Sequence, residues 1–289
     1  MNKPLPVVMT LGFALLAGAA WADDDRPIDQ RRPLKADARV AVSNVAGLIE
    51  VEAWDKNELH LTGTMADEVE KIEITGSDSS LKIEVKLPER TRNVGDTVLK
   101  LKIPAGASLD AEAVSADIRA KGLRGAVSAE SVSGDIDLDV GSKRVKAQTV
   151  SGDVTLQAPS EDTRIESVSG NVTLRGGKGE VRGESVSGNL QVQARELRML
   201  DLETVSGDME LDLEFTRDAE IEVETLSGDV RVTVSQLPDM DIELETYSGE
   251  LESGLLPGLR KQKEFDRDGE GKGRLRLHSF SGDVILKKK

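Results

Sequence analysis

The stretch Ser131-Val132-Ser133-Gly134-Asp135-Ile136 decides the fold, because the chain repeats it. A serine followed by glycine and then by Asp, Asn or Glu returns seven more times, and Ser115-Ala116-Asp117 is a degenerate copy. From Ser115 onward, successive corner serines are separated by 18, 18, 18, 18, 19, 21, 21 and 33 residues. A nearly constant period in this range indicates a solenoid, in which each repeat buries its apolar face by stacking on its neighbours.

Alignment of the repeats on the serine before each glycine shows that residue types alternate with a period of two, both before and after the corner. Two residues earlier lies Ser or Thr, as at Ser131, and three and five residues later lie apolar residues, as at Ile136 and Leu138. This pattern predicts two half-buried strands per coil, joined at the Ser-Gly-Asp corner. We therefore predict an all-β fold, a single-stranded parallel β-solenoid that forms a β-helix-like stack of 18–21-residue coils. The glycines expected to need a positive φ or a tight bend at these structural corners are Gly134, Gly152, Gly170, Gly188, Gly207, Gly228, Gly249 and Gly282.

An eighteen-residue period also fits a left-handed helix of hexapeptides, which needs an aliphatic residue at every sixth position. Val132 and Leu138 obey this rule, but Arg144, Asp162 and Glu180 occupy every third place in the series. A flattened coil with two sheets is therefore favoured over a triangular prism.

Three segments precede or interrupt the repeats. Residues 1–22 combine Lys3, an apolar run and Ala20-Trp21-Ala22, which is typical of a signal peptide. Residues 23–37 read as a flexible leader, and residues 38–289 as the solenoid, with irregular first coils over 38–108 and repeat coils over 109–289. Residues 254–273 form a charged excursion. We expect the coils to stack in chain order, so that Lys287-Lys288-Lys289 protects the far end of the rod.

Composition limits the function classes. The 289 residues carry a net charge of −15, contain no Cys and are only 2% aromatic. This charge disfavours nucleic acid as a partner, and the lack of Cys excludes thiol catalysis. Nucleophile motifs, phosphate loops and zinc-ligand spacings are also missing, so we predict no enzyme and no cofactor. With the signal removed and no other long apolar run, we expect an exported protein without a transmembrane segment, in the periplasm or on the cell surface.

Acidic residues concentrate in the later coils. Between positions 201 and 252 there are 17 Asp and Glu residues and only two Arg residues. Like charges about 5 Å apart repel by somewhat under 1 kcal/mol each in water, so a basic partner or cations would relieve them. The alternative is a solvated face that keeps the protein soluble. Stacking would align the candidate partner-binding residues in two columns, Asp201, Glu222 and Glu243 beside Glu203, Glu224 and Glu245.

No metal site is predicted. His60 and His278 are far apart in the sequence, and turn chemistry explains the corner carboxylates without a ligand, because Asp and Asn bond nearby backbone amides.

Four phrases together resemble the bacterial toastrack family. They are residues 130–136, residues 47–51 followed by Trp54-Asp55, residues 101–107 and residues 279–284. The resemblance covers nearly all of residues 38–289 and contains no catalytic motif. It implies a β-solenoid whose relatives are labelled putative adhesins or domains of unknown function, some of them placed beside membrane proteins in envelope-stress systems.

The sequence thus favours a non-enzymatic adhesin or interaction scaffold of the cell envelope, whose partner is an envelope protein or a glycan. The oligomeric state stays open. One alternative is a polysaccharide-active parallel β-helix enzyme that uses surface carboxylates, although sugar sites usually contain more aromatic residues. Another is a calcium-stiffened structural spacer, which would melt at a higher temperature when calcium is added.

Overall fold

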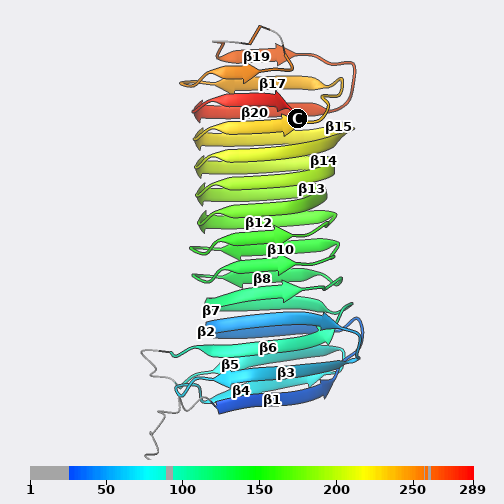
Figure 1. Ribbon diagram of the computed structural model, residues 1–289, viewed down its shortest axis with the longest axis vertical. Helices are drawn as coiled ribbons and strands as arrows, with labels where there is room; N and C mark the ends of the chain where they lie inside the picture. Colours follow the sequence, from blue (N-terminus) through cyan, green and yellow to red (C-terminus); the bar gives the residue numbers. More distant parts are fainter. Residues whose placement is uncertain (1–25, 89–93, 257, 260–261) are drawn as a thin grey trace, which may run out of the picture.

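The computed structural model describes residues 26–88, 94–256, 258–259 and 262–289. Within these ranges the chain is all-β, and its strands stack like the coils of a β-solenoid into a rod (Figure 1). The predicted signal peptide, residues 1–22, lies outside the described residues. No helix in the described ranges is long and apolar enough to span a bilayer.

Each repeat supplies one strand before its corner and one after it, which gives the rod a pre-corner face and a post-corner face. β8 (Val127–Ser131) and β9 (Ile136–Asp139) form one such rung. One coil later, β10 (Arg144–Thr149) pairs in parallel with β8, and β11 (Val154–Gln157) pairs in parallel with β9. The side chains alternate between buried and exposed along these strands, as the sequence predicts.

Five long strands contribute to both faces, because they continue through a bend. They are β2 (Arg39–Trp54), β7 (Ser108–Lys121), β13 (Val172–Ser187), β14 (Leu190–Ser206) and β15 (Met209–Ser227). The other strands are β1 (Arg26–Pro33), β3 (Glu58–Met65), β4 (Lys71–Ser77), β5 (Ser80–Lys86), β6 (Thr97–Pro104), β12 (Asp162–Ser169), β16 (Val230–Val234), β17 (Asp241–Thr246), β18 (Leu251–Ser253), β19 (Glu264–Arg267), β20 (Arg274–Ser281) and β21 (Val284–Lys288).

The coils do not follow chain order at either end of the rod. β20 pairs with β15 on one side and β17 on the other, and β21 lies between β16 and β18. Figure 1 shows this red final coil between the yellow and orange coils. Likewise, β2 lies between β6 and β7. The expectation that Lys287-Lys288-Lys289 closes the far end is therefore wrong, because β17 and β18 lie beyond the final coil.

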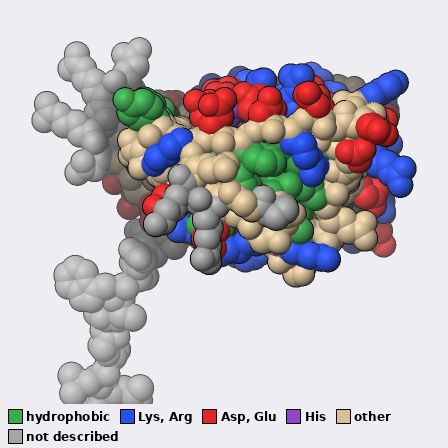
Figure 2. All heavy atoms as spheres, turned by 90° about the horizontal axis from the view of Figure 1, so that it is seen from above, with side chains coloured by type: hydrophobic (Ala, Val, Ile, Leu, Met, Phe, Trp, Pro, Cys, Tyr) green, Lys and Arg blue, Asp and Glu red, His purple; other side chains and the backbone are tan. Residues whose placement is uncertain are grey.

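Antiparallel strands cover both ends: β1 pairs with β3, β4 pairs with β5, and β19 pairs with β17. The predicted flexible leader is thus wrong for residues 26–33, which form β1 with Ile28 buried. An edge strand tolerates its prolines, because one side needs no hydrogen-bond donors. The described residues of the charged excursion form a cap that contains β19 and buries Leu256 and Leu259. Seen from that end, charged side chains surround a central apolar patch (Figure 2).

All eight corners require glycine, for two reasons. Gly170, Gly188, Gly207, Gly228 and Gly282 have φ between 133° and 152°, where a side chain is strained. The other three corners lack a positive φ but lie against the neighbouring coil, where a Cβ would collide with a backbone carbonyl: that of Ala116 for Gly134, of Gly134 for Gly152 and of Gly282 for Gly249.

The residue after each corner glycine links the rungs. From Asp117, in the degenerate corner, to Asp283, its side-chain oxygen accepts the backbone N–H of the equivalent residue one rung further on, with Asp135 at 3.1 Å at one end and Glu250 at 2.9 Å at the other. This ladder is unbroken in between, through Asp153, Asn171, Asn189, Asp208 and Asp229. The corner carboxylates therefore have a structural role in holding adjacent coils together.

Candidate functional site

Nine large apolar side chains project from one edge of the rod. Each belongs to the residue just before a corner serine, where alternation turns it outward and turns the preceding Ser, Thr or Ala inward. They are 44 to 73% exposed, and they are all of the exposed large hydrophobic residues in the part of the chain that the structure describes. In stack order this apolar ridge consists of Val114, Val132, Val150, Val168, Val186, Val205, Leu226, Phe280 and Tyr247.

The ridge is long and nearly aliphatic. At about 4.8 Å per rung, nine positions span roughly 38 Å. Its only aromatic members, Phe280 and Tyr247, stack at the end near β19 with ring centroids 4.9 Å apart and planes 6° apart.

A second line of outward side chains runs beside the ridge, two residues earlier in each strand. Carboxylates occupy seven of its nine positions, so we term it the carboxylate wall. In stack order it consists of Glu112, Glu130, Gln148, Glu166, Glu184, Glu203, Glu224, His278 and Glu245.

The ridge and the wall enclose a groove. Its floor is the column of inward residues between them, among them Thr149 and Thr204. The groove continues into the later coils, because its two adjoining hollows share Glu203 and Thr204. The arrangement offers a linear partner one apolar side and one anionic side.

Four of the six predicted partner-binding residues lie together. On β14 and β15, Asp201 faces Glu222, and Glu203 faces Glu224. Glu203 and Glu224 belong to the carboxylate wall, while Asp201 and Glu222 form the adjacent column, further from the ridge. These four carboxylates are the acidic cluster that the sequence predicts.

The other two residues are separated from that cluster, contrary to the predicted unbroken columns. β20 places Arg276 between Glu222 and Glu243, where Arg276 Nη1 lies 2.7 Å from Glu222 Oε1 and Arg276 Nε lies 3.0 Å from Glu243 Oε2. The hydrogen bond from Arg276 lowers the pKa of the Glu243 carboxyl below its usual range. The insertion of the final coil thus neutralises part of the acidic face.

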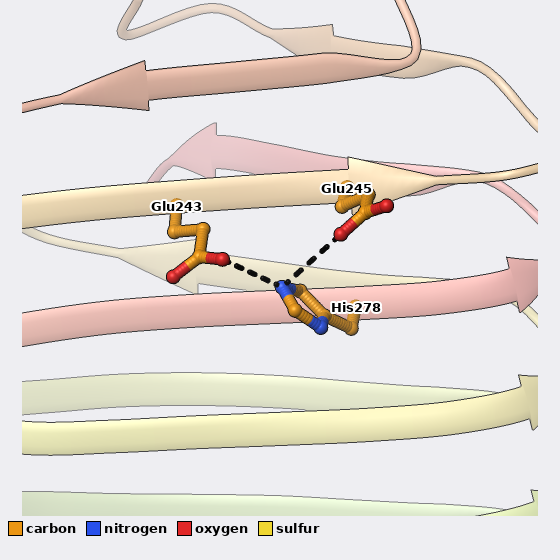
Figure 3. Close-up of side chains that lie close together, drawn as sticks. All are labelled: Glu243, Glu245 and His278. Carbon is orange, nitrogen blue, oxygen red and sulfur yellow. Dashed lines mark ion pairs between the residues drawn. The ribbon is translucent and has the colours of Figure 1, made fainter.

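His278 lies beside Arg276 on β20 and points toward β17 (Figure 3). Its Nε2 atom is 3.4 Å from Glu243 Oε1 and 3.7 Å from Glu245 Oε2. One imidazole nitrogen and two carboxylate oxygens, all within 4.8 Å of one another, are ligand atoms of the kind that bind zinc. However, Arg276 already binds the second oxygen of Glu243, and a metal ion would lie close to that guanidinium. We therefore assign this cluster to side-chain contacts between β17 and β20, with Arg276 as the cation that pairs with Glu243.

The predicted site residues did not include the apolar ridge. The signal was present in the repeated phrase Glu130-Ser131-Val132-Ser133. Since Ser131 faces inward by the predicted alternation, the valine after it must face outward. The same reasoning applied to every repeat finds the whole ridge, although a single exposed valine has no special meaning.

The Toastrack DUF4097 family model matches residues 36–287. The chain belongs to this family. The similar solved structures include a putative adhesin from Bacteroides fragilis, 13% identical, covering 91% of this chain and 97% of the other at a TM-score of 0.46. A putative lipid binding protein from Parabacteroides distasonis is 16% identical, covers 91% and 96% of the two chains and has a TM-score of 0.46. No curated protein sequence matches the chain. Family membership therefore rests on the match to the family model.

Proposed function

We propose that this Toastrack protein is an exported, non-enzymatic interaction scaffold of the cell envelope, similar in role to an adhesin, and that its groove holds an elongated partner protein. The apolar ridge carries this proposal. Contiguous exposed apolar surface is costly in water and commonly marks an interaction site. A solvated face would explain the charges of the wall, but it gives no reason for an apolar residue at the same exposed position of nine rungs.

The chemistry of the groove supports binding rather than catalysis. Its walls repeat nearly the same groups from rung to rung, whereas an active site needs a few groups whose surroundings differ from those of their neighbours. The corner carboxylates, which a polysaccharide-active enzyme or a calcium site could otherwise use, accept backbone N–H groups of the next coil.

Export is part of the proposal and rests on the sequence of residues 1–22, whose basic start, apolar run and Ala20-Trp21-Ala22 site are typical of a signal peptide. The periplasm is the favoured location, and the cell surface is the alternative.

Site-specific photo-crosslinking in intact host cells tests the function. The probe replaces Val186 on the ridge, and a matched probe replaces Thr155, an exposed residue on the post-corner face. We expect the probe at Val186 to give one defined protein adduct that the probe at Thr155 does not give. Equal adduct patterns, or no adduct at Val186 in folded protein, would overturn the proposal.

A further inference from the structure

The charge of the carboxylate wall changes along the rod. In the earlier coils, the neighbouring column supplies cations: Lys146 Nζ lies 2.9 Å from Glu130 Oε1, and Arg164 lies 2.7 Å from Glu166 and 3.6 Å from Glu184. This half of the wall is therefore largely neutralised from within the molecule.

The column beside the wall becomes acidic after Arg182. On the next rung its residue is Asp201, and on the rung after that it is Glu222. In the described part of the chain, neither Asp201 nor Glu203 has an ion-pair partner within 4.0 Å. Partial burial, followed by repulsion from Asp201 and Glu224, raises the pKa of the Glu203 carboxyl above its usual range. The negative charge at this point of the groove lacks a counter-charge.

The inward column under the same rungs holds two buried hydroxyls, and the ridge stands beside it. Thr204 and Thr225 are only 6% exposed, and their hydroxyl oxygens have no hydrogen-bond partner in the structure. Val205 and Leu226 stand on the ridge directly beside them. Anionic groups and exposed apolar side chains thus meet on two adjacent rungs of β14 and β15. Among the described residues, Glu203 on β14 has no counter-charge, and Glu224 on β15 has only His278 Nδ1, at 4.0 Å.

We propose that the segment held here is a cationic amphipathic helix, supplied by the partner protein of the proposed function, on which this inference rests. Its apolar stripe packs on Val205 and Leu226, and its Lys or Arg side chains pair with Glu203 and Glu224.

The spacing of the rungs favours a helix over an extended chain. A helical turn advances 5.4 Å, close to the rung spacing of about 4.8 Å, so that one turn matches one rung over several coils. In an extended segment, side chains on the same side are about 6.8 Å apart and lose the register after two rungs. An anionic lipid headgroup would meet the unpaired carboxylates and be repelled.

Fluorescence anisotropy with a synthetic probe tests the proposal. The probe is a dye-labelled 18-residue peptide of Leu and Lys with the 3.6-residue period of an amphipathic helix. A peptide of the same composition with strict alternation is the control for shape. We expect the helical peptide to bind more tightly than the alternating one, and its affinity to fall as salt is added.

Matched variants locate the binding. Glu203→Gln with Glu224→Gln should weaken binding of the helical peptide about tenfold, since two partly exposed ion pairs are lost. The control Asp137→Asn with Glu210→Gln removes two exposed charges from the post-corner face, where neither has an ion pair with any described residue, and should change affinity less than twofold. Leu226→Ser should weaken binding about tenfold without changing the net charge.

Two outcomes would overturn the proposal: equal loss of affinity in the wall variant and its control, or tighter binding of the alternating peptide. The helix proposal can fail while the groove itself still binds a partner. If the crosslinking probe at Val186 still captures a protein while the helical peptide does not bind, the proposed function stands and the cationic helix is rejected.

Discussion

The corners occur in two hydrogen-bonded forms, and the difference predicts opposite effects of one substitution. At one kind of corner, Thr149 Oγ1 accepts the N–H of Gly152 at 3.0 Å. At the other kind, the N–H of Gly207 donates instead to the backbone oxygen of Ser227 in the next coil at 3.0 Å. The hydroxyl of Thr204, at the position equivalent to Thr149, is then left without a partner.

Replacement of each threonine by valine, which has nearly the same shape, tests this difference. Thr204→Val removes a buried hydroxyl that has no partner, so the free energy of unfolding should rise by about 1 kcal/mol. Thr149→Val removes an acceptor and leaves the buried N–H of Gly152 unpaired, so the free energy of unfolding should fall by about 1–3 kcal/mol. The two sites are nearly equally buried, which makes each the control for the other.

Urea unfolding followed by circular dichroism measures both values. Because a stack of repeats can lose coils from its ends, the two variants are compared with the wild type only where the m-value is unchanged. Equal destabilisation by both substitutions would show that the Thr204 hydroxyl does have a partner, and the two-corner interpretation would be refuted.

Three further predictions concern the same coils. Asp153→Ala should lower the free energy of unfolding in urea by about 1–2 kcal/mol, because Asp153 Oδ1 accepts the N–H of Asn171 at 2.7 Å. Asp153→Asn keeps an acceptor and should be nearly neutral, and calcium should leave the Tm of the wild type unchanged. Gly170→Ala should destabilise the protein by a few kcal/mol, since φ is 152° and the new Cβ would collide with the neighbouring coil, while Gly254→Ala, with nothing within 4 Å, should be silent in the same assay. Glu203→Gln should raise the Tm slightly at pH 7, because a carboxyl whose pKa is raised in the folded state destabilises the fold when it is charged. This gain in Tm should vanish as the pH falls through that pKa. A gain that grows at low pH would contradict this reasoning.

The repeated phrase was sufficient to predict the coil. Alternation around Ser133 assigns Ile136 and Leu138 to the interior, and the structure buries both. The prediction works because a side chain in a half-buried strand has only two possible directions, and an aliphatic residue at the same position of every rung leaves one choice. The same logic identifies the groove, provided that outward positions are read as carefully as inward ones.

Local patterns could not predict β1, because they depend on apolar periodicity. Residues 26–33 contain Pro27, Pro33 and four charged residues, and only Ile28 is buried. Their strand conformation comes from pairing with β3, which lies about thirty residues further along the chain. An edge strand that buries one side chain gives almost no signal in the sequence.

The order of the coils is harder to predict, since the rungs offer nearly the same backbone ladder and the same inward aliphatic columns. Neither hydrogen bonding nor the core therefore distinguishes a final coil at the end of the stack from one inserted before the end. Charge does distinguish them. Stacking in chain order would place Glu222 beside Glu243, whereas insertion places Arg276 between them, within 3.0 Å of both. Each exposed ion pair contributes only about 0.2–1 kcal/mol, but insertion also removes a repulsion of similar size.

The corner ladder supports the same order. A rung inside the stack needs a short Asp or Asn side chain whose oxygen accepts the N–H of the next rung, and Asp283 does this for Glu250 at 2.9 Å. Glu250 is the only glutamate at a corner, and it stands on the rung where the ladder ends and no further N–H has to be accepted. The exceptional residues, Arg276 on an acidic face and Glu250 among Asp and Asn corners, thus carry the information that the repeats themselves lack. In a chain of nearly interchangeable rungs, departures from the repeat specify where each rung belongs.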